Sequence, residues 1–270
     1  MKSPALPRYV GTPVRQTARL AKDIAKKVRT FLIYALRAYK RRKQIYYIFF
    51  WRHAPIRRKT VFWESFYGRG MLDNPCALFR AMLDNPAYAD YRHVWVLDNP
   101  AYHAGLIRAY AKHRNVRFVA FQSYAYLRAL ATSETVVNNV TFWAYFIKRA
   151  GQTYVNTWHG IPLKTIGADD NRLESTNMVR NFLQADILLS ANAFLTSVYR
   201  QSFCLGSLFR GEIVEEGYPR LDTLVSDDRQ TTLQALRDHG VALSDDCAII
   251  LYAPTWRGVY ERPEVGLDEA

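Results

Sequence analysis

The sequence VWVLDNPAYHAGLIRAYAKHRNVRFVAFQSYAYLRALATSETVVNN, residues 94–139, contains three short β-rich runs separated by two stretches of helical composition. The β-rich runs are 94–97, 116–121 and 135–137, and the helical stretches are 105–113 and 123–132. Strands that alternate with helices are typical of a parallel sheet that is covered on both faces. This stretch therefore predicts an α/β fold built on a parallel sheet.

The same alternation extends in both directions along the chain. Further strands are predicted at 60–63, 153–157, 186–190, 213–215 and 248–252, with a long helical stretch from about residue 173. In open parallel sheets, ligands bind in the crevice beyond the carboxyl ends of the strands. This rule directs attention to the loops at 68–74, 98–100, 138–139, 158–164, 217–222 and 254–257.

The composition excludes several classes of protein. The 270 residues are 49% hydrophobic, which is enough apolar material for a folded core and excludes disordered, collagen-like and disulfide-scaffold chains. Cys76, Cys204 and Cys247 are far apart and form no CxxC or Cys/His cluster, so we expect reduced thiols and no zinc site. The sequence has no P-loop, GxGxxG, GxSxG or HExxH motif, and we expect no cofactor and no metal.

The positive charge is concentrated at the N-terminus. The chain has a net charge of +13, but residues 1–60 hold 17 Lys and Arg against the single acid Asp23, and the remainder carries about −3. An asymmetry of this kind indicates a tethering arm, which we assign to residues 1–58.

The arm has the pattern of an amphipathic helix. Apolar residues at steps of three and four share one helical face: Leu20, Ile24, Val28, Phe31, Leu32, Ala35 and Tyr39. The apolar runs 31–36 and 45–51 are too short for a bilayer span of about 20 residues and are separated by bases, so we expect no transmembrane helix. Cations beside bulky apolar residues favour an anionic membrane surface. A partner protein or a nucleic acid is the alternative, and the wide apolar stripe argues against nucleic acid.

The segment Asn156-Thr157-Trp158-His159-Gly160-Ile161-Pro162-Leu163-Lys164 is the most informative for chemistry. A strand leads into His159, Gly160 lets a ligand approach the backbone, and Pro162 restricts the loop. A histidine held rigidly at the carboxyl end of a strand can accept a proton, since its ordinary pKa is near 6.5. A packed core histidine is the alternative. Lys164 and Arg172 are candidate anion contacts.

Two other strands are followed by proline-containing turns that present an arginine. These turns are Gly217-Tyr218-Pro219-Arg220-Leu221-Asp222 and Tyr252-Ala253-Pro254-Thr255-Trp256-Arg257. Guanidinium groups bind phosphate oxygens in a bidentate manner. Two such arginines together with a histidine favour phosphoryl chemistry over acyl chemistry, although each arginine alone could be a structural ion-pair partner.

These motifs resemble those of the CDP-glycerol glycerophosphotransferases, which make teichoic acids and related capsule polymers. Residues 158–167 are similar to the family signature WHGTPLKxxG, with Ile161 in place of threonine. Residues 217–222 resemble GxPRxD, residues 252–257 resemble YAPTWR, and residues 64–75 resemble the family's opening strand and loop. Four motifs in order across residues 61–257 make the resemblance specific.

The resemblance implies a peripheral enzyme at the cytoplasmic face of the membrane, with a GT-B-like pair of facing Rossmann-type domains. His159 would be the base for the acceptor hydroxyl. The donor would be CDP-glycerol or CDP-ribitol, the acceptor a lipid-linked polyol phosphate or glycan, and CMP the leaving group. The candidate substrate-binding residues are Gly68, Trp158, Gly160, Pro162, Lys164, Arg220, Asp222, Thr255 and Arg257.

The C-terminal part is short for this architecture. We assign residues 59–216 to a Rossmann-like acceptor domain and residues 217–270 to the start of an incomplete nucleotide-binding domain. In the family, most CDP-binding residues lie beyond the YAPTWR motif, so this chain alone is expected to be inactive. It is either a fragment or a natural truncation, and in the second case a non-catalytic membrane-docking module is the alternative function.

Overall fold

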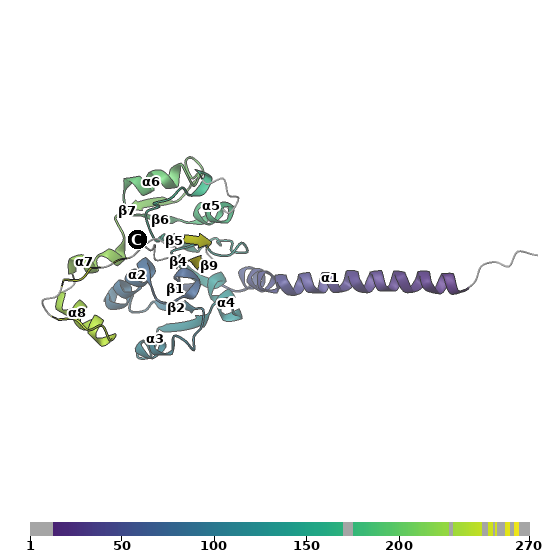
Figure 1. Cartoon of the computed structure of the whole chain (residues 1–270), viewed down its shortest axis with the longest axis horizontal. Coiled ribbons are helices and arrows are strands. Elements are labelled where there is room, and N and C mark those ends of the chain that lie inside the picture. The colour runs from purple at the N-terminus through teal and green to yellow at the C-terminus, as the bar shows by residue number, and fades with distance from the viewer. Residues whose placement is uncertain are drawn as a thin grey trace, which may run out of the picture. The chain divides into compact units, whose positions relative to one another are not determined.

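Seven parallel strands form a single sheet in the order β3-β2-β1-β4-β5-β6-β7 (Figure 1). The structure is a computed structural model that describes residues 13–169, 175–226, 229–244, 248–250, 252, 257–259 and 262–264. The strands are β1 (Arg57–Glu64), β2 (Arg92–Leu97), β3 (Val116–Ala120), β4 (Ser133–Asn138), β5 (Thr153–Asn156), β6 (Ile187–Ser190) and β7 (Glu212–Glu215). The predicted parallel α/β fold is confirmed, and the seven strands lie within a few residues of the predicted ones.

The strand order changes direction between β1 and β4. The chain adds β2 and β3 on one side of β1, and it then returns to add β4, β5, β6 and β7 on the other side. The pairs Trp63↔Val137 and Glu64↔Asn138 place the carboxyl ends of β1 and β4 directly side by side. A switch point of this kind opens a crevice between the loops that follow the two strands.

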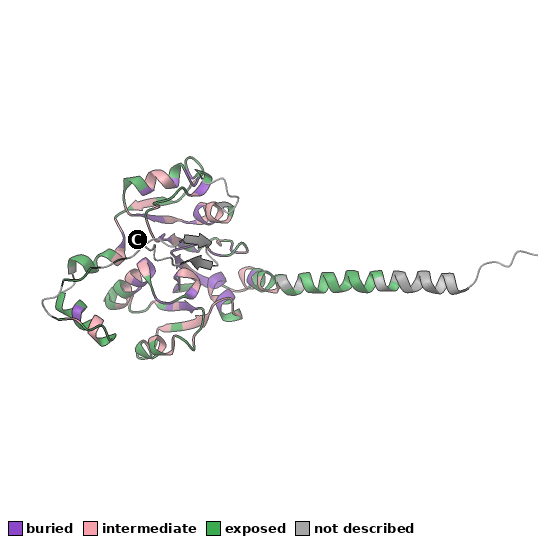
Figure 2. Ribbon diagram, in the orientation of Figure 1, coloured by how far each residue is buried: buried purple, intermediate pink, exposed green. Residues whose placement is uncertain are grey.

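Helices cover the two faces of the sheet and complete two apolar clusters. The helices are α2 (Asp73–Asp84), α3 (Ala104–Ala109), α4 (Tyr124–Thr132), α5 (Ser175–Gln184) and α6 (Ala193–Arg200). One cluster joins Val61, Trp63 and Trp95 to Phe79 of α2, with the two indoles stacked at 5.8 Å. Figure 2 shows that the buried residues are concentrated in the strands and on the helix faces turned toward them.

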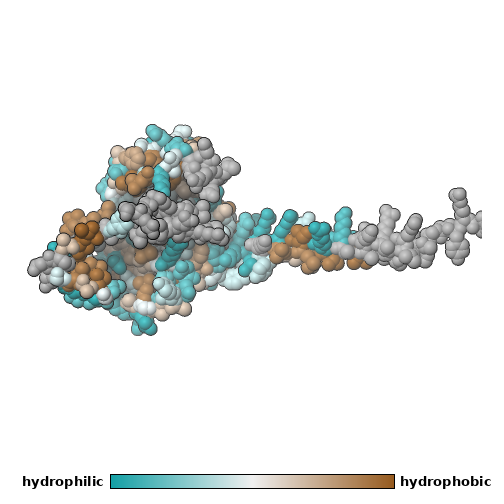
Figure 3. Space-filling model, viewed as in Figure 1, coloured by the Kyte–Doolittle hydropathy of each residue, from teal (hydrophilic) through white to brown (hydrophobic). Residues whose placement is uncertain are grey.

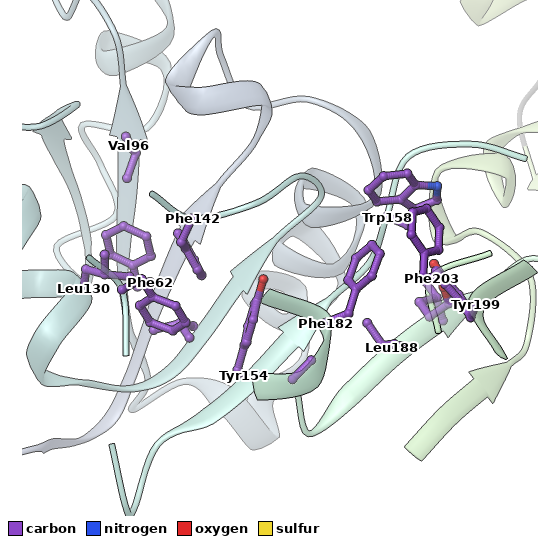
Figure 4. Packing of buried hydrophobic residues seen from close by; sticks show 14 of the residues in the cluster. Phe62, Val96, Leu130, Phe142, Tyr154, Trp158, Phe182, Leu188, Tyr199 and Phe203 are labelled. Carbon is purple, nitrogen blue, oxygen red and sulfur yellow. The ribbon is translucent and has the colours of Figure 1, made fainter. Parts of the chain in front are cut away.

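The larger cluster lies under α4, α5 and α6. Phe62 of β1 contacts Tyr126 of α4 with ring centroids 5.4 Å apart. Phe182 of α5 contacts Tyr199 of α6 with ring centroids 5.5 Å apart (Figure 4). Alternation along the strands explains the division, because Val61 and Trp63 point to one face and Phe62 to the other. Of the cysteines, Cys76 is buried and Cys204 exposed, both as free thiols, and Cys247 lies outside the described residues.

The predicted N-terminal helix is confirmed as α1 (Pro13–His53), which is continuous through both apolar runs. Its last turns pack on the body, where Tyr47 Oη and Trp51 Nε1 donate to the carbonyl of Ile147 at 2.8 and 2.9 Å. The earlier turns expose large apolar side chains, among them Phe31 at 70%. Brown and teal residues lie along opposite sides of this part of α1 in Figure 3. Within the described residues, no helix has the length and apolarity needed to cross a membrane.

The chain divides into two compact units, Met1–Leu221 and Asp222–Ala270. The second unit contains α7 (Thr223–Ser226), α8 (Arg229–Asp238) and an antiparallel pair, β8 (Arg257–Val259) and β9 (Arg262–Glu264). The division falls five residues beyond the predicted boundary after residue 216, because the short turn η4 (Pro219–Leu221) packs on α2 of the first unit. The assignment of the units to an arm and two domains stays a prediction.

The predicted strand at 248–252 is wrong for the residues that are described there. Residues 248–250 and 252 are not in a strand, and Ile249 and Ile250 are 54% and 92% exposed. A run of apolar residues forms a strand only when a neighbouring strand satisfies its backbone hydrogen-bonding groups. Among the described residues of the second unit, only β8 and β9 are strands, and they pair with each other.

Candidate active site

His159 lies in the loop that follows β5, at the carboxyl edge of the sheet. The loop begins with a sharp bend at Trp158, whose φ of +50° is rare for a residue with a side chain. Asn156 Oδ1 accepts the backbone N–H of Trp158 at 2.9 Å, and Thr157 N donates to Asn138 O at 2.9 Å. These bonds hold the bend and direct the next residue toward the crevice.

The indole of Trp158 anchors the loop in the core. It is buried and packs against Phe182 and Phe203 with centroid distances of 5.2 and 5.8 Å (Figure 4). We predicted Trp158 as a substrate contact, but the structure buries its side chain and gives it an anchoring role. The large apolar area it buries makes the position of the adjacent His159 rigid.

The tautomer of His159 is fixed by a single hydrogen bond. Its Nδ1 lies 2.7 Å from the carbonyl oxygen of Asn139, and a carbonyl oxygen can only accept, so Nδ1 carries the proton. Burial lowers the pKa of His159 and thereby favours the neutral ring. The neutral ring then has its lone pair on Nε2. The ring is half-buried between Trp158 and Phe66, whose ring centroids lie 4.2 and 5.7 Å from its own.

Arg220, at η4, is tied to the same loop. Its Nη1 donates to the backbone carbonyl of His159 at 3.0 Å and forms an ion pair with Asp73. Its own backbone N–H donates to Asn74 Oδ1 at 3.3 Å. The structure therefore brings Arg220 and His159 together, and it adds a carboxylate partner that the sequence did not indicate.

Asp73 and Asn139 connect the loops of neighbouring strands. Asn139 Nδ2 donates to Asp73 Oδ2 at 2.6 Å, and Asn139 Oδ1 accepts the N–H of Phe66 at 3.0 Å. Asp73 adopts a φ of +60°, a strained conformation that these contacts hold in place. The sequence analysis did not identify either residue, although both lie in loops at the carboxyl ends of strands, where it expected ligands to bind.

Asn74 links the loop that follows β1 to the loop that follows β5. Its Nδ2 donates to the carbonyl oxygens of Thr157 and Trp158, each at 3.3 Å. Its side chain is fully buried, so it is a structural element that locks α2 to the loop of His159.

The other candidate residues are distributed more widely. A Cβ added at Gly160 would meet no atom within 4 Å, so the space beside the loop is open to a ligand. Pro162 is half-buried and Lys164 is exposed on the same loop. Gly68, with a φ of +90°, packs against the end of β2, where a Cβ would lie 2.8 Å from the nitrogen of Asp98. Gly68 is therefore needed for packing, and its predicted contact with the substrate stays a prediction.

Some candidates cannot be placed at this site. Asp222 is exposed and begins the second unit, and Thr255 and Arg172 lie outside the described residues. Arg257 is described only for its backbone, at the start of β8. Within the described ranges, no three His, Cys, Asp or Glu side chains gather in a way that could hold a metal ion.

A layer of buried polar side chains lies beneath the site. Glu64, Asn138 and Asn156 are register partners on β1, β4 and β5, and all three are fully buried. Asn156 Nδ2 donates to Asn138 Oδ1 at 3.0 Å, but neither carboxyl oxygen of Glu64 has a hydrogen-bond partner among the described residues. Burial raises the pKa of Glu64 to about 8, so the carboxyl is mainly protonated at neutral pH.

Sequence comparison identifies a matching protein family and named relatives. Residues 45–269 match the sequence profile of a family described as CDP-Glycerol:Poly(glycerophosphate) glycerophosphotransferase. The chain is 32% identical over 212 residues to the teichoic acid poly(glycerol phosphate) polymerase of Bacillus subtilis (strain 168), covering 75% of this chain and 27% of that protein. It is 29% identical over 210 residues to the teichoic acid glycerol-phosphate transferase of Staphylococcus aureus (strain NCTC 8325 / PS 47), covering 74% and 51%. The chain thus spans about a quarter to a half of the length of these relatives.

Solved structures give the same result for the fold. The wall teichoic acid polymerase TagF aligns with a TM-score of 0.68 and 29% identity over 88% of this chain and 57% of that chain. A TagF variant with a histidine replaced by asparagine, soaked with CDPG, aligns with a TM-score of 0.67 and 29% identity over 86% and 57%.

Proposed function

This chain belongs to the CDP-glycerol:poly(glycerophosphate) glycerophosphotransferase family, as its motifs predicted, and we propose that it forms the acceptor-side part of such an enzyme. The reaction would transfer glycerol phosphate, or a related polyol phosphate, from a CDP-linked donor to a hydroxyl of a teichoic-acid acceptor. The names of the relatives, which are glycerol phosphate polymerases and transferases, favour glycerol over ribitol. A complete enzyme would pair this sheet with a second Rossmann-type domain in a GT-B-like arrangement.

The observation that carries this proposal is the fixed tautomer of His159. In the proposed step the acceptor oxygen attacks the β-phosphorus of the donor, and the bond from that phosphorus to the bridging oxygen breaks. CMP leaves with the bridging oxygen, and the acceptor proton moves to Nε2 of His159. Because Nδ1 donates to Asn139 O, the lone pair that accepts this proton is on Nε2. The imidazolium then keeps the same Nδ1 hydrogen bond.

Asp73 and Arg220 act as positioning residues in this scheme. Arg220 holds the backbone of His159, and Asp73 holds both Arg220 and the Asn139 side chain. Phosphoryl transfer depends mainly on positioning and on stabilisation of charge, with little covalent participation by the protein. A rigid link between three loops supplies the first of these requirements.

The lipid-linked acceptor and the location at the cytoplasmic face of the membrane are the remaining parts of the proposal. They are supported by α1, which exposes Ile24, Val28, Phe31 and Leu32 beside bases such as Lys27 and Arg29. A helix with this pattern binds anionic bilayers through its apolar face, and each nearby cation adds about 1 kcal/mol. Attachment of this kind would keep the active site close to a lipid-linked acceptor.

The proposed role of His159 is tested by measuring CMP release by a protein that contains this chain and has the full length of its relatives. His159→Ala should slow release about 10²- to 10⁴-fold, because the proton acceptor is lost. His113→Ala, a substitution in the turn after α3, is the matched control and should retain normal turnover. Unchanged turnover in the His159 variant would remove this residue from the mechanism.

A non-catalytic membrane-docking module is the second candidate function, and the exposed apolar stripe of α1 favours it. This alternative predicts that the 270-residue chain floats with anionic vesicles but neither binds CDP-glycerol nor releases CMP. Detection of CDP-glycerol binding by the chain, for example by calorimetry, would exclude this alternative.

A further inference from the structure

A cluster of basic side chains lies at the amino edge of the sheet, away from the carboxyl edge that carries His159. Because the strands are parallel, all their amino ends lie at this edge. A depression of about 920 Å³ opens there, with Arg57, Arg58, Lys59, Tyr91 and Arg92 among its lining residues. Its lining is rich in cations and distinct from every residue assigned above to the transferase site.

The two acids at this edge already have partners. Glu134 forms an ion pair with Arg58 at 2.8 Å, and Asp90 pairs with Lys59. In the ranges that the structure describes, Arg57 and Arg92 have no carboxylate within ion-pair distance, and the same holds for Arg117 of β3 and Arg128 of α4. These four guanidinium groups therefore have no ion-pair partner in the described part of the protein.

The charges of three of these arginines act on the fourth, Arg57. Burial lowers the pKa of Arg57, and the charges of Arg128, Arg117 and Arg92 lower it further. The register agrees, because Arg117 pairs with Val94 and Arg92 precedes Val94 by two residues, which places both arginines on the same face of the sheet. Like charges held together in this way are unfavourable unless an anion lies between them.

The backbone at this edge is also irregular. Lys59 has a φ of +52°, and the register of β1 against β4 shifts between Arg57 and Val61. The N–H of Lys59 donates to Glu134 Oε2 at 2.6 Å. Bulges and strained residues are retained mainly where they direct side chains to a functional position. Here the irregular segment carries Arg57, Arg58 and Lys59, three of the cations that line the depression.

We propose that Arg57, Arg92, Arg117 and Arg128 form a second binding site, whose ligand is a phosphodiester anion. Guanidinium groups match the oxygens of a phosphodiester and keep their charge at every physiological pH. Arg57 follows the end of α1 at His53 by four residues, so this member of the cluster lies at the base of the helix that carries the exposed apolar face. The identification of the ligand as a glycerol phosphodiester, from the polymer or from a lipid headgroup, rests on the proposed function, whereas the anion site does not.

The experiment compares two charge-matched double variants of the full chain. Arg92→Gln/Arg117→Gln removes two cations of the cluster, and Arg108→Gln/Arg200→Gln removes two exposed arginines on α3 and α6. Binding of glycerophosphoglycerol is measured by calorimetry at low salt, and binding of vesicles by co-sedimentation, with phosphatidylglycerol in phosphatidylcholine against phosphatidylcholine alone. Because α1 is unchanged in both variants, its contribution to vesicle binding cancels.

The cluster variant should lose about tenfold in affinity relative to the control variant, which corresponds to the loss of one charge-assisted hydrogen bond. Selective loss with the soluble diester identifies the polymer as the source, and selective loss only with phosphatidylglycerol vesicles identifies the lipid. Equal affinities of the two variants for both probes would overturn the proposal. His159→Ala should leave both measurements unchanged, so a failure of the transferase proposal is separated from a failure of this one.

Discussion

The buried carboxyl of Glu64 should make the stability of the first unit depend on pH. Glu64 is fully buried at the end of β1, and neither of its carboxyl oxygens has a hydrogen-bond partner among the described residues. Its pKa is raised from 4.5 to about 8, mainly by burial, and the neighbouring Tyr126 hydroxyl acts in the opposite direction. Glu64→Gln keeps the shape of the protonated acid but cannot ionise.

The size of the effect follows from proton linkage. Between the unfolded pKa of 4.5 and the folded pKa near 8, the folded protein holds one proton that the unfolded chain releases. Stability is therefore highest below pH 4.5 for this group and falls with rising pH, by at most about 1.4 kcal/mol per pH unit. Over the range from pH 5 to pH 8 the loss amounts to about 3 to 4 kcal/mol.

The assay is urea unfolding at pH 5, 6, 7 and 8, followed by the fluorescence of the buried tryptophans Trp63, Trp95 and Trp158 in the first unit. Glu64→Gln should resemble the unsubstituted protein at pH 5 and exceed it by about 3 kcal/mol at pH 8. Glu216→Gln, at an exposed carboxylate after β7, is the control and should leave the pH dependence unchanged. A difference between the Glu64 variant and the unsubstituted protein that stays constant across this pH range would refute the reasoning.

Three further predictions concern packing and the base. Gly68→Ala should lower the free energy of unfolding by about 3 kcal/mol in urea titrations, through its positive φ and its close approach to β2, whereas Gly105→Ala has open space and should not. Tyr47→Phe should cost about 1 kcal/mol in thermal unfolding, because its hydroxyl donates to the Ile147 carbonyl. In the full-length enzyme, the pH–rate profile should rise with a midpoint below 6.5, since burial lowers the pKa of His159.

The order of the strands along the chain could be predicted because their composition is local. Runs such as 94–97 are apolar on both faces, and buried parallel strands require this pattern whatever their neighbours are. The segment 248–252 has a similar composition, but the strand predicted there is wrong for its described residues. A strand needs a neighbouring strand to satisfy its backbone groups, and composition carries no information about neighbours. The position of β4 beside β1, which creates the crevice, was equally invisible in the sequence.

The site could be predicted only where a motif marks it. His159 lies between a strand and a Gly-Ile-Pro turn, which is a local signal, and the structure places it at the carboxyl edge as expected. Asp73 and Asn139 act through contacts that span 66 and more residues of sequence, namely Asn139 to Asp73 and Asp73 to Arg220. Long-range pairs of this kind leave no periodicity or spacing to detect. The rule that ligands bind beyond the carboxyl ends of parallel strands identified their loops, but it could not identify the individual residues.

The contacts of Arg220 change the role that its position in the sequence suggested. A guanidinium at the end of a strand suggested a phosphate ligand, but Nη1 is engaged with Asp73 and with the carbonyl of His159. The charges of Asp73 and Arg220 act on the pKa of His159 in opposite directions, so the ion pair leaves burial as the dominant influence. An arginine without this carboxylate would lower the pKa of His159 further and weaken it as a base. The Asp73–Arg220 pair therefore fixes the loop of His159, and its two charges act on the pKa of the imidazole in opposite directions.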